Sequence, residues 1–125
     1  IRAIQENKHR AVLVPIPAST REKNRIRYEE FCRKLSADIG VADGYGAITL
    51  TADRPQLKGT HGQDKTANLQ FHPEYIKDKC VLLLDDLLTT GEGFIQTRRK
   101  LIEHGAKFVI GLFLAKTIAF EDEQE

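Results

Sequence analysis

A chain of 125 residues has room for one hydrophobic core, and its 41% hydrophobic and 30% charged residues are typical of an ordinary globular domain. The formal net charge of +1 argues against a dedicated nucleic-acid binder. No apolar stretch approaches the roughly 20 residues that a membrane-spanning helix needs, and the first residues lack a signal-peptide pattern. These properties favour a small cytoplasmic domain without a membrane partner.

The ends of the chain and its cysteines suggest how the domain is organised. The sequence begins at Ile1 and contains no methionine, so we expect that residues are missing before it. Cys32 falls in a helical pattern and Cys80 at the start of a strand pattern, which indicates reduced structural thiols rather than a disulfide or a metal site. We expect one domain over residues 1–125.

Strand and helix patterns alternate along the chain. The strand patterns cover residues 11–15, 47–51, 81–84 and 107–114. The helix patterns cover residues 22–39, ending near Gly40, and residues 92–104, ending at Gly105. Residues 52–78 carry no sustained period. Such alternation predicts an α/β fold, with a parallel sheet covered by helices on both faces.

The exit from the first strand combines stiffness with positive charge. Its sequence is Val-Pro-Ile-Pro-Ala-Ser-Thr-Arg, from Val14 to Arg21. The prolines hold the exit extended, and the spacing puts Arg21 and Arg25 on one helical face. Alone, this segment is typical of a turn followed by a solvated basic face. Beside a phosphate site, it would suit an anion-binding loop.

The segment 54–71 has no strong secondary-structure signal. Long segments of this kind in compact domains are usually functional or disordered. It contains two glycines that could act as hinges, and Lys58, His61 and Lys65 supply donors that could close over an anionic ligand. The pattern predicts a mobile lid.

The run from Cys80 to Phe94 carries the most information about function. Its four apolar residues 81–84 indicate a strand buried on both faces, so Asp85 and Asp86 should lie at the carboxyl edge of the sheet, where open α/β sheets bind ligands. Hydroxyls and glycines follow within one turn, at Thr89, Thr90, Gly91 and Gly93. Together with free N–H groups at a helix start, they make a phosphate cradle.

Carboxylates beside a phosphate cradle suit a phosphorylated sugar. Its diol can donate hydrogen bonds to Asp85 and Asp86, while its phosphate sits on residues 89–93. This order of residues resembles the ribose-phosphate motif of type I phosphoribosyltransferases. That family usually has Thr or Ser where this chain has Gly93, so we expect a weaker phosphate site here.

The resemblance implies a Rossmann-like type I phosphoribosyltransferase core that binds 5-phosphoribosyl 1-pyrophosphate with Mg²⁺. It would transfer the phosphoribosyl group to an unidentified nitrogenous acceptor. Asp85 and Asp86 would hold the diol and water ligands of the metal, and together with the lid residues Lys58 and Lys65 they are the candidate catalytic residues. The 5′-phosphate would lie on Leu88, Thr89, Thr90, Gly91, Glu92 and Gly93. The pyrophosphate would lie on Ile16, Pro17, Ala18, Ser19, Arg21 and Arg25.

Within that family, Val-Pro-Ile-Pro followed by spaced arginines is closest to the ComF-like, amidophosphoribosyltransferase-related members. Lys65, Asn68 and Phe71 loosely match a segment of the same group. A second copy of the chain is a candidate partner, in a homodimer.

The alternative is a non-catalytic binding or regulatory module with the same fold. The departure at Gly93 favours it, as does the lack of an obvious segment for a hood over the acceptor. Two other motifs fail. Residues 59–66 approach a P-loop, but Asp64 puts negative charge where phosphates would lie. A receiver domain would have its acidic pair after the first strand, and here the pair follows the third predicted strand.

Overall fold

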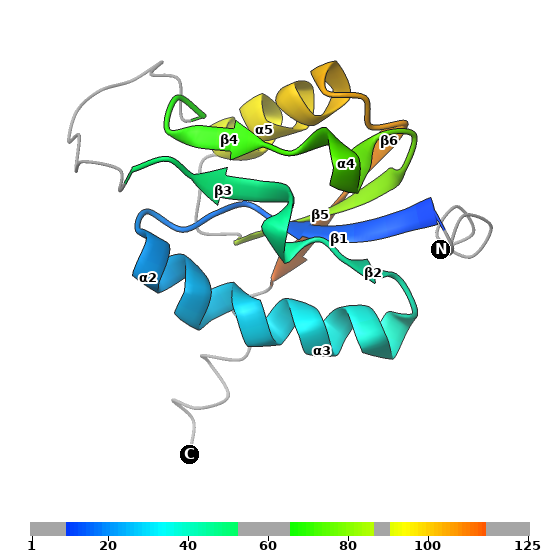
Figure 1. Cartoon of the computed structure of the whole chain (residues 1–125), viewed down its shortest axis with the longest axis horizontal. Coiled ribbons are helices and arrows are strands. Elements are labelled where there is room, and N and C mark those ends of the chain that lie inside the picture. Colours follow the sequence, from blue (N-terminus) through cyan, green and yellow to red (C-terminus); the bar gives the residue numbers. More distant parts are fainter. Residues whose placement is uncertain (1–9, 53–65, 87–90, 115–125) are drawn as a thin grey trace.

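The computed structural model describes residues 10–52, 66–86 and 91–114, and these build an α/β fold around a parallel four-stranded sheet. The strands run in the order β2 (Ala42–Asp43), β1 (Ala11–Pro15), β5 (Cys80–Asp86) and β6 (Phe108–Leu114). Side chains of β1 and of the first residues of β5 are buried, because both central strands are covered on both faces. The predicted fold class is confirmed (Figure 1).

One face of the sheet is covered by a continuous helical rod over residues 21–39 (Figure 1). The rod consists of α2 (Arg21–Asn24), a π-helical turn η2 (Arg25–Glu29) and α3 (Glu30–Ile39). Thr20 caps its start by accepting a hydrogen bond from the Lys23 amide, and Gly40 ends it with a left-handed φ of 75°.

The π turn is the one departure from the helix predicted for this segment. The buried polar and apolar side chains of the rod recur at every fourth residue, as Asn24, Tyr28, Cys32 and Ser36. A turn of 3.6 residues would rotate such a series steadily away from the sheet. The wider π turn reduces that rotation and keeps the series on one face.

The other face is covered by α5 (Glu92–Glu103), α4 (Pro73–Ile76) and an antiparallel pair, β3 (Ile48–Leu50) with β4 (Leu69–Phe71) (Figure 1). A short 3₁₀ turn, η3 (Tyr45–Ala47), leads into β3. Alternate residues of β1 and β5 supply the two cores. Val12, Val14, Val81 and Leu83 face α5 and β3, and Leu13, Leu82 and Leu84 face the rod.

The strand predicted at 47–51 is present, but the expectation that it joins the parallel sheet is wrong. β3 pairs only with β4 among the described residues, and β2 takes the place beside β1. The burial of β3 alternates, with Ile48 and Leu50 buried and Thr49 half-buried. Such alternation is typical of an antiparallel strand covering a core on one side. β2, β4 and α4 are too short for their periods to be visible in the sequence.

Both cysteines are free and buried, in agreement with structural thiols. Burial raises the pKa of the Cys32 thiol to about 12, and burial also raises the pKa of Cys80. Both therefore remain protonated at neutral pH. In the described ranges, no helix has the length and apolar character needed to cross a membrane.

Candidate functional site at the carboxyl edge of the sheet

The ends of β1 and β5 lie side by side at the carboxyl edge of the sheet. Pro15 pairs with Leu84, and the amide of the next residue, Ile16, donates to the Leu84 carbonyl at 2.9 Å. Asp85 and Asp86 extend β5 beyond this point, opposite residues of β6. The loop 16–20 and the acidic pair, almost 70 positions apart in the sequence by their numbers, thus meet at one edge.

Asp85 is the most deeply buried acidic residue that the structure describes, with only 5% of its surface exposed. A carboxylate in such a position is costly unless hydrogen-bond donors face it. For the same reason, a ligand hydroxyl that reaches it donates into a low-dielectric site, where a charge-assisted hydrogen bond is strong. Asp86 continues the strand backbone opposite Leu114.

α5 begins beside this edge, at Gly91. This residue is the N-cap and has a left-handed φ of 91°, a conformation that favours glycine. A Cβ added there would meet no atom of the described residues within 4 Å. Glu92 and Gly93 lie inside the first turn of α5.

The protein itself uses two of the four backbone donors in the loop 16–20 after β1. The Ile16 amide bonds to Leu84, Pro17 has no N–H, and the Ala18 amide donates to Asn24 Oδ1 at 3.0 Å. In the described part of the chain, the amides of Ser19 and Thr20 make no such bond. An anion at this loop would therefore meet Ser19 and the start of the rod.

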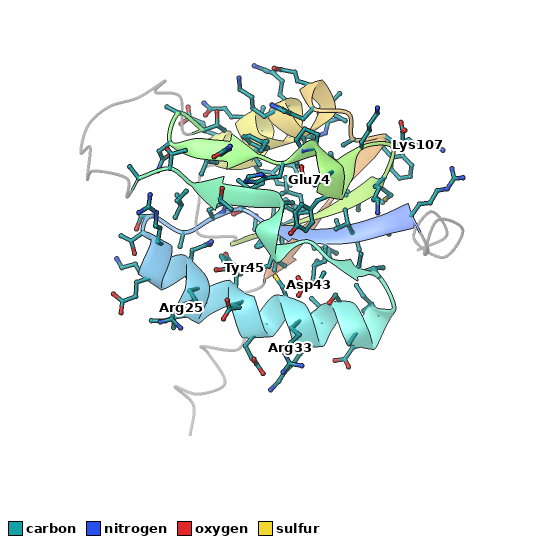
Figure 2. All side chains as sticks on the ribbon, in the orientation of Figure 1. Arg25, Arg33, Asp43, Tyr45, Glu74 and Lys107 are labelled. Atoms are coloured by element: carbon teal, nitrogen blue, oxygen red, sulfur yellow. The ribbon has the colours of Figure 1, made fainter. Side chains whose placement is uncertain are left out.

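The structure separates the two arginines that the sequence assigned to pyrophosphate. The Arg21 side chain donates through Nε to the Leu50 carbonyl at 3.2 Å and through Nη2 to the Thr51 carbonyl, which ties the rod to the end of β3. Arg25 lies exposed on the rod (Figure 2). Contact of Arg21 with pyrophosphate would first require these two hydrogen bonds to open.

Five of the predicted site residues lie outside the described residues, namely Lys58, Lys65, Leu88, Thr89 and Thr90, and so does His61. The structure describes only the last part of the segment expected to form a lid, and there the chain contains β4, a strand that the sequence pattern did not indicate. Asn68 accepts from the amide and hydroxyl of Thr51, and Phe71 ends β4 and stacks on His104 with ring centroids 5.2 Å apart.

Sequence reasoning missed Asn24. This residue is 6% exposed and anchors the loop through its bond with the Ala18 amide. Its signal in the sequence was a polar residue four positions before Tyr28, in a series that faces the core.

The donor set at the edge suits magnesium only in part. Among described residues, no three His, Cys, Asp or Glu side chains group into a metal site. Magnesium, however, commonly uses one or two carboxylates together with substrate phosphates and water. Asp85 and Asp86 fit that mode, in which most ligands come from the substrate.

The protein has a Rossmann-like α/β fold. Three features lie at the carboxyl edge of its sheet: the acidic end of β5, the start of α5 at Gly91, and the loop 16–20, which we call the proline loop. The chain is 30% identical over 99 residues to the orotate phosphoribosyltransferase of Pyrococcus abyssi (strain GE5 / Orsay), and the match covers 75% of this chain and 52% of that protein. The chain thus spans about half the length of the curated relative it matches. No family model matches the chain.

This similarity supports a relationship to the type I phosphoribosyltransferases, in agreement with the fold. It gives no support to the narrower resemblance to ComF-like or amidophosphoribosyltransferase-related members.

Proposed function

We propose that the chain is the core of a phosphoribosyltransferase that binds 5-phosphoribosyl 1-pyrophosphate with Mg²⁺ and transfers the phosphoribosyl group to a nitrogenous acceptor. The observation that carries this proposal is the meeting of the proline loop, the buried Asp85 and the Gly91 helix start at one carboxyl edge. The similarity to an orotate phosphoribosyltransferase supports it independently.

Each part of the edge has a role in the proposed reaction. Asp85 and Asp86 accept hydrogen bonds from the ribose diol and orient the sugar. The turn leading to Gly91 and Gly93 receives the 5′-phosphate, with the positive end of the α5 dipole behind it. Ser19 and the start of the rod receive the pyrophosphate.

The reaction breaks the bond from ribose C1 to a pyrophosphate oxygen and forms a bond from C1 to the acceptor nitrogen. Positive charge develops on the sugar ring and negative charge on the leaving pyrophosphate. Bound Mg²⁺ would supply neutralising charge to the pyrophosphate. The carboxylates of Asp85 and Asp86 hold the diol on the side of the developing cation, so their contribution is positional and electrostatic.

The proposal is tested first by binding and then by turnover. Calorimetry with phosphoribosyl pyrophosphate and Mg²⁺ should show saturable heat, which should disappear when Mg²⁺ is chelated. The release of pyrophosphate should then be measured with orotate, the acceptor in the relative's name, and with other nitrogenous bases. Absence of saturable binding under these conditions would refute the proposal.

Binding without turnover would favour the non-catalytic module. The observation that keeps this second function open is Gly93, which offers a backbone amide but no hydroxyl in the first turn of α5. Pyrophosphate release that depends on an added acceptor would exclude it.

A further inference from the structure

A pocket of about 300 Å³ opens between the start of the rod and the η3–β3 segment. Its polar lining comes from Arg21, Asn24, Tyr45 and Thr49, and its apolar walls are Ile48 and Leu50. Tyr45 is the first residue of η3 and lies on the side of this segment that faces the rod (Figure 2). The described lining residues include none from β5 or α5, so this pocket is distinct from the edge that carries Asp85.

The unusual group in this pocket is the Asn24 amide. Asn24 is 94% buried, since 6% of its surface is exposed, and its Oδ1 is occupied by the Ala18 amide. Across the described ranges, its Nδ2 donates no hydrogen bond to the protein. A buried amide nitrogen with two unused N–H donors is unfavourable unless something from outside accepts from it. The pocket is the space from which such an acceptor can arrive.

The charged and polar groups around the pocket indicate the charge of the ligand that accepts from Asn24. Arg21 brings a guanidinium, and among the described lining residues there is no aspartate or glutamate. Thr49 Oγ1 already lies 2.9 Å from His72 Nε2. Desolvation and the charge of Glu29 raise the pKa of Tyr45, which keeps its phenol protonated as a donor. Donors therefore dominate, and a negatively charged acceptor is favoured over a cation.

The volume and the apolar side chains of the pocket indicate the size and shape of the ligand. Its volume is at the lower limit of ligand pockets, which span about 300 to 1,000 Å³. The ring of Tyr45 and the side chains of Ile48 and Leu50 offer apolar surface. A small body with a flat apolar part and one anionic group fits these walls, whereas a polyphosphate has no apolar part to place there.

We propose that this pocket is a second ligand site, which binds a small planar carboxylate. One carboxylate oxygen accepts from Asn24 Nδ2, the positive charge of Arg21 stabilises the anion, and the ring lies against Tyr45 and Leu50. Because Asn24 Oδ1 holds the Ala18 amide, the bound ligand also fixes the residue that anchors the loop after β1.

Solution NMR with benzoate as the probe tests the site without any variant. Titration should shift the Asn24 side-chain amide pair and the backbone amides of Gly46 and Thr49 saturably. Benzamidine, which has the same ring with a cationic group, should leave them in place. Shifts that are absent, that do not saturate, that are scattered over the surface, or that are equal for both compounds would overturn the proposal.

Two variants sharpen the test. Asn24→Asp keeps the acceptor for the Ala18 amide, removes both Nδ2 donors and adds repulsion, so it should weaken benzoate binding by at least about tenfold. Gln70→Glu makes the same chemical change at an exposed position of β4 outside the pocket and should bind like wild type. Equal affinity in all three proteins would refute the site. If Asn24→Asp does not fold, the chemical-shift changes that benzoate and benzamidine cause in the wild type still test the proposal.

Phosphoribosyl pyrophosphate and Mg²⁺ are left out of these titrations. A failure of the function proposed above would therefore leave the outcome at this pocket unaffected, and the reverse also holds.

Discussion

The loop that leaves β1 and the end of β5 lie at the same edge of the sheet, and they differ in how they are built. In the loop, the Ile16 and Ala18 amides are bonded inside the protein and Pro17 lacks a donor, while the Ser19 and Thr20 amides donate no hydrogen bond to the described residues. β5 ends with the buried Asp85 followed by Asp86, and α5 then begins at Gly91, which has a left-handed φ. The first region is a wall held in part by internal hydrogen bonds, whereas the second brings Asp85 and the start of α5 to the edge.

This difference suggests a division of labour at the edge. A wall whose hydrogen bonds are internal holds its shape without a ligand, so its residues should matter for stability. The end of β5 with Asp85 and the start of α5 at Gly91 should matter for binding. Substitutions in the two regions should then affect different measurements.

The largest effect is expected from the double substitution Asp85→Asn/Asp86→Asn. Hydrogen bonds to charged groups contribute about 1.5 to 3 kcal/mol each, so losing the charged acceptors should weaken binding of phosphoribosyl pyrophosphate with Mg²⁺ roughly 100-fold or more. Calorimetry measures the affinity, and circular dichroism checks that the fold is kept. Unchanged affinity in a folded variant would show that the acidic pair does not face the ligand.

In the β1 loop, Asn24→Ala should act on stability instead. It leaves the Ala18 amide without its acceptor, which should lower the free energy of unfolding by about 1 to 3 kcal/mol. Urea denaturation measures the loss, and hydrogen exchange at the Ala18 amide should become faster. Thr20→Ala is the matched control, since it removes only the helix cap, at about 0.5 to 2 kcal/mol. Unchanged exchange at Ala18 would contradict the anchoring role of Asn24.

At the start of α5, Gly91→Ala separates backbone strain from packing. The added Cβ contacts no described atom within 4 Å. The free energy of unfolding should therefore fall by about 1 to 2 kcal/mol because of the left-handed φ. Gly111→Ala is the contrasting variant, because its Cβ would lie 2.8 Å from Phe94 and 2.9 Å from Phe113 at ordinary backbone angles. Thermal unfolding of both proteins measures the two costs. A Gly91→Ala protein as stable as wild type would mean that this φ is not required.

The smallest effect is expected from Gly93→Thr. Gly93 lies in α5 and has no positive φ, so threonine meets no backbone penalty of that kind. A hydroxyl restored to the first turn should tighten binding of phosphoribosyl pyrophosphate by about 0.5 to 1.5 kcal/mol. Calorimetry under the conditions of the first prediction measures the change. Weaker binding with an unchanged fold would show that the glycine is needed for close approach of the ligand.

Much of the fold could be predicted from local sequence. The apolar runs at 11–15, 81–84 and 107–114 predicted three strands of the parallel sheet, and the helical periods at 22–39 and 92–104 predicted the helices on its two faces. These signals are strong because a doubly covered strand must be apolar along its length and a covering helix must be apolar along one stripe. The position of Asp85 and Asp86 followed from the same reasoning.

The pairing of the shorter strands and the hydrogen-bond partners of the polar side chains were determined only by the tertiary structure. β3 carries a strand pattern, yet its pairing with β4 rather than with β1 depends on which face of the core was left uncovered. Arg21 has the positive charge that an anion site needs, but its side chain donates hydrogen bonds to the carbonyls at the end of β3. Local propensity determines whether a residue is helical or extended, whereas the pairing of a polar group depends on what the folded chain brings within hydrogen-bond distance.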